Sequence, residues 1–422
     1  MATLAIAGGP PALAAWPHPH ADRARFTDED QAAISAYLSE DNPNSYFGDG
    51  GVLHDYEREL AAYFNRRYCL LTNSGTTALH SAFVAVGIEP GDEVIGPVYT
   101  FHAAVTPLFQ IGAVPVLADV EPDTGNIDPQ DVARKITDRT RAIVVTHQYG
   151  HPVDGPAIRA VADQHKLSLI EDVSLAVGST LHGVRAGQFG DVACFSLGST
   201  KLLSGGQGGA LVMDDPSCCE RANLLGHFGA RCYETVQSPT YRQFAETGYG
   251  LNYRMHAVAA AVSRSRFHRI DALIESRRQR YEQLSELIAS TGVLDPPITR
   301  PGATRGSWQG YCATYRADRT GVPIDLFVNA LREEGLEVTA RGYHQPLHHT
   351  RIFQTVHDGL RRRTGYAKNR RTYRTGDFPV VEAHVAGLVG FPLFLDEDPD
   401  LIAAYGAGCR KVAGALESLS AA

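Results

Sequence analysis

Residues 191–212 read Asp-Val-Ala-Cys-Phe-Ser-Leu-Gly-Ser-Thr-Lys-Leu-Leu-Ser-Gly-Gly-Gln-Gly-Gly-Ala-Leu-Val. Apolar runs at the two ends of this stretch predict buried strands, Val192–Phe195 and Ala210–Met213. A polar turn and a glycine-rich turn lie between them, and Lys201 is the only charged side chain there. A lysine in apolar surroundings loses hydration, which lowers its pKa and frees the neutral amine that forms a Schiff base.

Ser196 and the turn that follows it offer a hydroxyl group and backbone N–H donors, which suit a phosphate group. The alternative is that Lys201 is a surface lysine in a loop between two strands, as most lysines are. We favour the functional interpretation because other segments of the chain independently supply parts of the same site.

Composition sets the broad class of the protein. The chain has 422 residues, 44% hydrophobic and 20% charged, which is enough for a large core and two domains. The formal charge of −8 argues against nucleic acid or anionic membranes as partners. Seven cysteines without a C-x-x-C pair indicate reduced thiols in a cytoplasm and no zinc cage. The N-terminus lacks a basic segment, and no apolar run approaches a membrane span, so we expect a soluble, cytoplasmic protein.

From Tyr68 onward, short apolar runs alternate with helix-length segments. Such alternation predicts an α/β fold with a mostly parallel sheet covered by helices on both faces. Helices are expected from about Thr76 and from about Phe101. The expected strands are Cys69–Leu71, Val94–Ile95, Val114–Leu117, Ala142–Val145 and Leu167–Ile170.

Other helices flank this alternating region. The spacing of apolar residues predicts helices over 27–39, 53–64 and 324–334, and a long one over 256–288. We therefore expect three parts: a large domain with the N-terminal segment (1–255), a bridging helix (256–290) and a smaller α+β domain (291–422).

Ligands of such sheets bind beyond the carboxyl ends of the strands, so the residues that follow each strand are the candidates. Ser74-Gly75-Thr76 opens a helix and forms an anion site of free N–H groups, although such residues also serve as ordinary helix caps. Phe101 is an aromatic at the same edge, or a core residue. Asp172 ends another strand, where a buried carboxylate needs a partner such as a protonated pyridine nitrogen; as the alternative, it only caps the strand.

The loop around Tyr343 contains three histidines, His344, His348 and His349. Histidines are common metal ligands, but no Asp or Glu lies near them in the sequence at a spacing typical of a metal site. The sequence therefore predicts no metal site here.

Pyridoxal phosphate requires an anion site, an aromatic side chain, a carboxylate at the end of a strand and a lysine later in the chain. The sequence contains all four. From about residue 5 to 415 the chain resembles the DegT/DnrJ/EryC1/StrS family of fold type I aminotransferases. The motifs that carry this resemblance are Asn73-Ser74-Gly75-Thr76, Gly91-Asp92-Glu93-Val94-Ile95, Ile170-Glu171-Asp172, Phe195-Ser196 with Lys201, Gly205 to Gly209, and Gly250-Leu251-Asn252-Tyr253-Arg254-Met255.

The resemblance implies a role for each matching residue. Lys201 would hold pyridoxal 5′-phosphate as a Schiff base and then transfer the proton, with pyridoxamine 5′-phosphate as the intermediate form. Asp172 would pair with the pyridinium nitrogen, and Phe101 would stack on the ring. Asn252 would reach the phosphate of the neighbouring subunit, which implies a homodimer with shared active sites. The phosphate itself would be held by Ser74, Gly75, Thr76 and Ser196.

Two positions depart from the family pattern. Leu175 stands where members commonly have Gln or His near the phenolic oxygen of the cofactor, and Gln207 stands where they usually have Glu. Both departures bear on the electronic tuning of the cofactor and on the substrate. The residues that we expect to contact the substrate are Tyr99, Arg254, His344 and His348.

The start of the chain and Lys201-Leu-Leu-Ser-Gly-Gly resemble the cyclitol aminotransferases of aminoglycoside pathways and the aminohydroxybenzoate synthases. We therefore expect a keto-cyclitol (scyllo-inosose-like) or related carbocyclic ketone as substrate, with L-glutamine or L-glutamate as donor. The main alternative is a nucleotide-linked keto-sugar. Dehydration is disfavoured because related sugar dehydratases have histidine in place of Lys201. A non-catalytic partner or regulator of the same fold is a further alternative, which the presence of Lys201 also disfavours.

Overall fold

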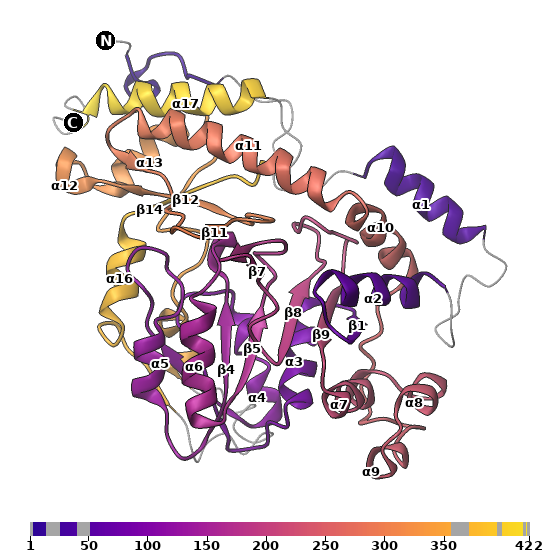
Figure 1. The fold of residues 1–422 in the computed structure, drawn as a ribbon. Coiled ribbons are helices and arrows are strands. Elements are labelled where there is room, and N and C mark those ends of the chain that lie inside the picture. Colours follow the sequence, from indigo (N-terminus) through magenta and orange to yellow (C-terminus); the bar gives the residue numbers. More distant parts are fainter. Residues whose placement is uncertain are drawn as a thin grey trace.

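A computed structural model of the chain describes residues 3–13, 26–39, 51–355, 371–394, 399–416 and 419. Its centre is a seven-stranded sheet in the order β1-β9-β8-β5-β4-β2-β3 (Figure 1). Only β9 runs against its neighbours, so the expected mostly parallel α/β sheet is confirmed. The strands are β1 (Tyr68–Thr72), β2 (Glu93–Pro97), β3 (Val114–Ala118), β4 (Thr140–Thr146), β5 (Ser168–Asp172), β8 (Val192–Ser196) and β9 (Gly209–Met213).

Side chains of these strands alternate between two buried faces, because successive residues of a strand point to opposite sides. On one face Val94 and Val144 pack with residues of α3, and on the other Ile95 and Ile143 pack with residues of α5 and α6. A third cluster joins Phe195 of β8 to α2 and α10. The helices that cover the sheet include α2 (Val52–Tyr63), α3 (Gly75–Ala85), α5 (Pro129–Lys135), α6 (Gly155–His165), α7 (Pro216–Gly226) and α10 (Ala257–Phe267).

Two of the expected helices differ from the structure. The segment from Phe101 forms a short 3-10 helix η2 (His102–Ala104) and a single turn, α4 (Leu108–Ile111), because Pro107 has no N–H to continue a helix. The expected helix 256–288 is divided at His268–Arg269 into α10 and α11 (Ile270–Ala289).

The second half of the chain forms a four-stranded sheet in the order β10-β12-β14-β13, overlaid by α11, α13 and α17 (Figure 1). Leu4 of the N-terminal segment is buried in this second core, and Glu334 accepts hydrogen bonds from the N–H groups of Ala5 and Ala12. The domain boundaries given above stay a prediction. The elements here are η1 (Ala5–Ala7), α13 (Ile324–Glu333), α17 (Pro399–Ala413), β10 (Leu294–Asp295), β12 (Tyr311–Tyr315), β13 (Thr339–Ala340) and β14 (Leu388–Phe391).

Shorter elements complete the described chain. Helix α1 (Asp28–Leu38) packs on α10, where Arg266 and Asp30 form a buried ion pair at 2.7 Å. None of the helices in the described ranges has the length and apolar composition needed to cross a membrane. The remaining elements are η3 (Gln148–Gly150), α8 (Ala230–Thr235), α9 (Pro239–Arg242), α12 (Ala317–Thr320), η4 (Leu347–His349), α14 (Arg351–Gln354), α16 (Pro379–Ala386), and the small sheet β11 (Ala303–Thr304), β6 (Thr180–Leu181), β7 (Val184–Arg185).

Candidate active site

A cavity of about 550 Å³ lies beyond the carboxyl ends of the central strands. Asp172 ends β5 and Ser196 ends β8, and both side chains reach this cavity because parallel strands end at one edge of the sheet. The sequence-predicted residues that line it are Ser74, Gly75, Thr76, Phe101, Asp172, Ser196, Lys201 and His344.

One end of the cavity is built for an anion. Ser74 caps α3 by accepting a hydrogen bond from the N–H of Thr77 at 3.2 Å, which leaves the first-turn N–H groups of Gly75 and Thr76 without helical acceptors. A Cβ atom on Gly75 would lie 2.8 Å from the Cβ of Ser196, so only glycine lets the helix approach β8 this closely. The helix dipole and the Ser196 hydroxyl thus face the same anion site.

Lys201 follows a tight turn in which its N–H donates to the carbonyl of Gly198 at 2.9 Å. Burial lowers the pKa of Lys201 to about 8; Asp172 opposes this effect and the nearby Arg277 adds to it. Burial also raises the pKa of Asp172, against the hydrogen bond from Ser174 and the attraction of Lys201. The cavity therefore holds a lysine whose neutral form is accessible near physiological pH, beside a buried carboxyl group.

Behind Asp172, a buried pair fixes the end of β5. His147 Nε2 lies 3.0 Å from the carboxylate of Glu171, which also accepts hydrogen bonds from the N–H groups of Gly187 and Gly190. Burial alone would raise the pKa of Glu171, but these hydrogen bonds hold it below its usual value. Glu171 is therefore a charged group that orients the strand, and Asp172 is the one that faces the cavity.

Two rings, those of Phe101 and His344, line the cavity and lie 5.7 Å apart. Phe101 is 49% exposed. Burial, together with the nearby Lys201, lowers the pKa of His344. The alternative that Phe101 belongs to the core does not hold, because its ring lines the cavity.

Leu175 and Gln207, which depart from the family pattern, both line the cavity. Of the two hydroxyl groups that stand near Leu175 in sequence, Ser174 also lines the cavity and accepts a hydrogen bond from the N–H of Ser196 at 3.0 Å. Thr180 is paired with Thr304 instead, with the two hydroxyl oxygens 2.8 Å apart.

Four predicted site residues lie outside this cavity. Tyr99 is buried, and its hydroxyl oxygen lies 2.7 Å from that of Tyr149, which does line the cavity. Asn252 is exposed, and its side-chain oxygen accepts hydrogen bonds from the N–H and Nε of Arg254, which also lies outside the cavity. His348 is buried against Glu382. Their roles in binding stay predictions.

Other lining residues have no counterpart in the sequence-based prediction. Gln309 donates a hydrogen bond from Nε2 to the carbonyl of Thr200 at 2.6 Å. Gln309 belongs to the second half of the chain, and no local sequence pattern predicts that it lines the cavity. The further lining residues of this kind include Thr100, Thr146, Tyr149, Gly310, Tyr343 and Leu393.

The profile of the DegT/DnrJ/EryC1/StrS aminotransferase family matches residues 28–374 of the sequence. The chain belongs to this family. It is 36% identical to the L-glutamine:2-deoxy-scyllo-inosose aminotransferase of Streptoalloteichus tenebrarius, over 73% of each chain. It is 34% identical to the enzyme of the same name from Streptomyces kanamyceticus, over 76% of this chain and 74% of that one.

Solved structures of aminotransferases share the fold. The structure of DesI in the presence of its TDP-sugar product superposes with a TM-score of 0.81 at 26% identity, covering 99% of this chain and 98% of that one. The aminotransferase of Psychrobacter cryohalolentis gives a TM-score of 0.80 at 25% identity, covering 96% and 99%. The predicted fold and the assignment as an aminotransferase are thus confirmed.

Proposed function

We propose that this aminotransferase uses pyridoxal 5′-phosphate to convert a keto-cyclitol of the scyllo-inosose type, or a related carbocyclic ketone, to the amine. The observation that carries the proposal is Lys201, whose pKa is lowered by burial, beside Asp172 in a cavity that also contains an anion site. The relatives named above support the substrate class, because their names specify L-glutamine and 2-deoxy-scyllo-inosose.

The donor set fits the cofactor. Gly75 lies close to Ser196, so the N–H groups at the start of α3 and the Ser196 hydroxyl can bind one phosphate group. Asp172 offers a carboxylate for the ring nitrogen. Phe101 would cover one face of the ring. When bound, pyridoxal phosphate supplies an aldehyde that reacts with amines and a ring that withdraws electrons.

Lys201 would carry out two tasks. Because burial lowers the pKa of Lys201, its Nζ is neutral often enough near pH 8 to bond covalently to the cofactor. The same Nζ, once released, is placed to accept and return a proton within the cavity. The positive ring nitrogen would keep Asp172 ionised. The ionised Asp172 would in turn hold the cofactor in its electron-withdrawing state.

The proposed assembly is a homodimer in which Asn252 completes the phosphate site of the neighbouring subunit. Asn252 is exposed and lies outside the cavity of its own chain, which supports a role across an interface. The proposed partners are therefore a second copy of the chain, the ketone and the amino donor, either L-glutamine or L-glutamate.

A substrate panel tests the proposal. The purified protein is incubated with keto-cyclitols or nucleotide-linked keto-sugars, each with L-glutamine or L-glutamate, and the amine product is measured by mass spectrometry. We expect product from a keto-cyclitol, and reduction with borohydride should fix the cofactor on Lys201. Product from nucleotide-linked sugars alone would replace the substrate class, and a Lys201→Ala protein with unchanged activity would refute the role of Lys201.

A nucleotide-linked keto-sugar is the second candidate substrate. The similarity to DesI, solved with a TDP-sugar product, favours this class of ketone as the second candidate. The keto-cyclitol ranks first because the relatives that carry it in their names are 36% and 34% identical over 73% to 76% of each chain.

A further inference from the structure

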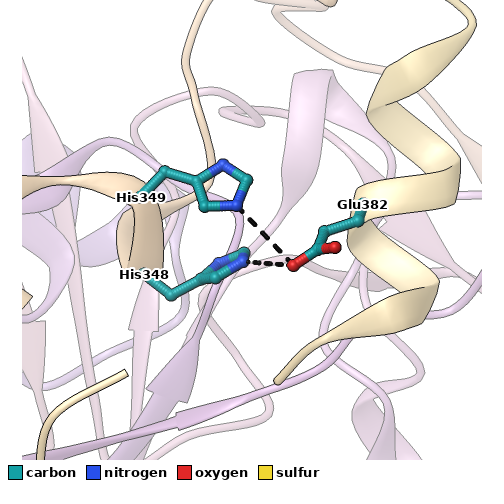
Figure 2. Close-up of side chains that lie close together, drawn as sticks. All are labelled: His348, His349 and Glu382. Atoms are coloured by element: carbon teal, nitrogen blue, oxygen red, sulfur yellow. Dashed lines mark hydrogen bonds and ion pairs between the residues drawn. The ribbon is translucent and has the colours of Figure 1, made fainter. Parts of the chain in front are cut away.

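Three side chains that are typical metal ligands converge outside the active-site cavity (Figure 2). His348 and His349 end η4, and Glu382 lies on α16, 34 positions after His348. The Nε2 atoms of His348 and His349 lie 2.8 Å and 3.6 Å from Oε1 of Glu382. Figure 2 shows both rings directed at the same carboxylate oxygen. The carboxylate that the sequence lacked at ligand spacing is thus supplied by a distant helix.

The two distances to Glu382 are close to those of a tetrahedral zinc site. The three ligand atoms all lie within 4.8 Å of one another. Zinc bonds of about 2.0–2.1 Å at tetrahedral angles place neighbouring ligand atoms about 3.3 Å apart. The contact of His348 with Glu382 must therefore widen by about 0.5 Å and that of His349 must shorten by about 0.3 Å. Rotations of side chains accommodate changes of this size.

A simple hydrogen-bonded pair explains His348 and Glu382, but not the second histidine. Nε2 of His349 is buried and has no hydrogen-bond partner among the described residues, although it faces a carboxylate. An unpartnered buried nitrogen is costly unless something binds it. By contrast, His268 pairs with Glu59 at 3.0 Å with no second histidine directed at the carboxylate among the described residues.

A backbone hydrogen bond fixes the carboxylate of this cluster. The N–H of Gly376 donates to Oε1 of Glu382 at 2.7 Å. The same hydrogen bond orients the carboxylate, as partners of metal ligands commonly do.

Access to the cluster comes from one side. The side chain of His348 is fully buried, whereas those of His349 and Glu382 are 28% and 23% exposed. A metal held by the three residues would therefore keep an open position for water, as in three-ligand zinc sites. Two imidazoles and one carboxylate are a donor set typical of zinc.

We propose that His348, His349 and Glu382 bind a zinc ion that joins η4 to α16. The N–H of Leu347 in η4 donates to the carbonyl of Val98, which follows β2. His344, three residues earlier, lines the active-site cavity. The ion would thus stabilise one wall of the cavity without contacting its contents.

The test uses the full chain without an affinity tag, freed of metal by dialysis against EDTA. Zinc is titrated in competition with a chromophoric chelator, and bound metal is counted by mass spectrometry. We expect about one zinc ion per chain, and a thermal midpoint raised by about 2–4 °C in zinc relative to EDTA. The cobalt-loaded protein should show the visible absorption of a tetrahedral ion.

The variants decide which residues bind. His349→Ala removes a ring with no hydrogen bond among the described residues, and Glu382→Gln keeps the acceptor for Gly376; each should weaken zinc binding at least about tenfold. His268→Ala, from the His–Glu pair without a second histidine, should leave zinc binding unchanged. The proposal is overturned if the protein binds no zinc, or if His349→Ala binds it as tightly as the parent protein. If Glu382→Gln unfolds, the His349→Ala result decides the question.

Discussion

The guanidinium group of Arg277 donates a hydrogen bond to the side-chain oxygen of Gln309 at 3.0 Å, in a buried region near Lys201. The amide of Gln309 in turn donates to the carbonyl of Thr200, the residue before Lys201, at 2.6 Å. Arg277 also donates to the carbonyl of Ser307. Helix α11 is therefore connected to the lysine turn through two side-chain hydrogen bonds.

This connection predicts the effect of changing Gln309. Gln309→Leu removes the donor to the Thr200 carbonyl and one acceptor of Arg277, and a buried polar group that loses its partner costs about 1–3 kcal/mol. We expect a lower free energy of unfolding and an activity reduced about tenfold, because Lys201 loses its fixed position. Chemical denaturation and initial rates measure the two effects.

The variant Gln309→Glu distinguishes an effect on the position of Lys201 from an effect on the stability of the protein. Glutamate still accepts from Arg277 but cannot donate to Thr200, and it adds a negative charge near Lys201. It should recover only the part of the stability that comes from the contact with Arg277, because the Thr200 carbonyl stays without this donor, and it should raise the pKa of Lys201. If Gln309→Leu and Gln309→Glu leave both the rate and its pH dependence at the parent values, the connection has no role in positioning the lysine.

The second prediction concerns the ionisation of Lys201 itself. Burial lowers the pKa of Lys201 to about 8, below the usual lysine value of 10.5, so the neutral amine predominates above pH 8. In the protein stripped of cofactor, labelling of Lys201 by an amine-reactive anhydride should increase with pH and reach half of its maximum near pH 8. Peptide mass spectrometry at a series of pH values measures this midpoint.

Asp172 provides the control for this titration. Its attraction raises the pKa of Lys201 against the larger effect of burial. Asp172→Asn removes that attraction, so the midpoint of labelling should move below 8. A midpoint near the ordinary lysine value in the parent protein would show that Lys201 is hydrated, and the proposed activation by burial would be wrong.

The sequence predicts these central groups well because strand ends are local features. Asp172, Ser196 and Lys201 each follow or precede an apolar run, and the parallel sheet brings such positions to one edge. The helix expected from Phe101 shows where local spacing fails: its apolar residues recur at helical intervals, but Pro107 interrupts the hydrogen-bond pattern.

Contacts between distant segments could not be predicted in the same way. Gln309 reaches the lysine turn from a segment more than 100 positions later, and nothing in its neighbours marks it. Glu382 meets His348 across 34 positions, from another helix. Local spacing determines which elements form, whereas these pairs depend on how the elements pack, which a single sequence does not reveal.

The third prediction concerns Leu175, which lines the cavity where family members commonly have a polar side chain. Leu175→Gln adds a hydrogen-bond donor there without a large change in volume. We expect tighter retention of the cofactor, by up to about tenfold, and a shifted pH dependence of its visible absorption. Dialysis followed by titration of the absorption band measures both.

Leu175→Met is the matched control, since it keeps the size and the apolar character of the side chain. It should retain the cofactor as the parent protein does. Superimposable titration curves and equal affinities for the glutamine variant and the parent would mean that residue 175 does not meet the cofactor, although it lines the same cavity.

The last prediction tests the shared active site through Asn252. If Asn252 completes the phosphate site of the neighbouring subunit, Asn252→Ala should weaken cofactor binding without changing the fold of its own chain. Lys201→Ala should abolish activity. Chains of the two variants, co-expressed with different tags and purified as heterodimers, carry one site with both residues intact.

The purified heterodimers should have about half of the wild-type activity, because each dimer has one intact site of two. The control pairs Lys201→Ala with a chain that carries both substitutions, which yields no intact site and should stay inactive. Because Asn252 is exposed and its side chain contacts Arg254 of its own chain, a purely local role is the competing explanation. In that case the purified heterodimer has no more activity than the average of its two parents, and the active site belongs to a single chain.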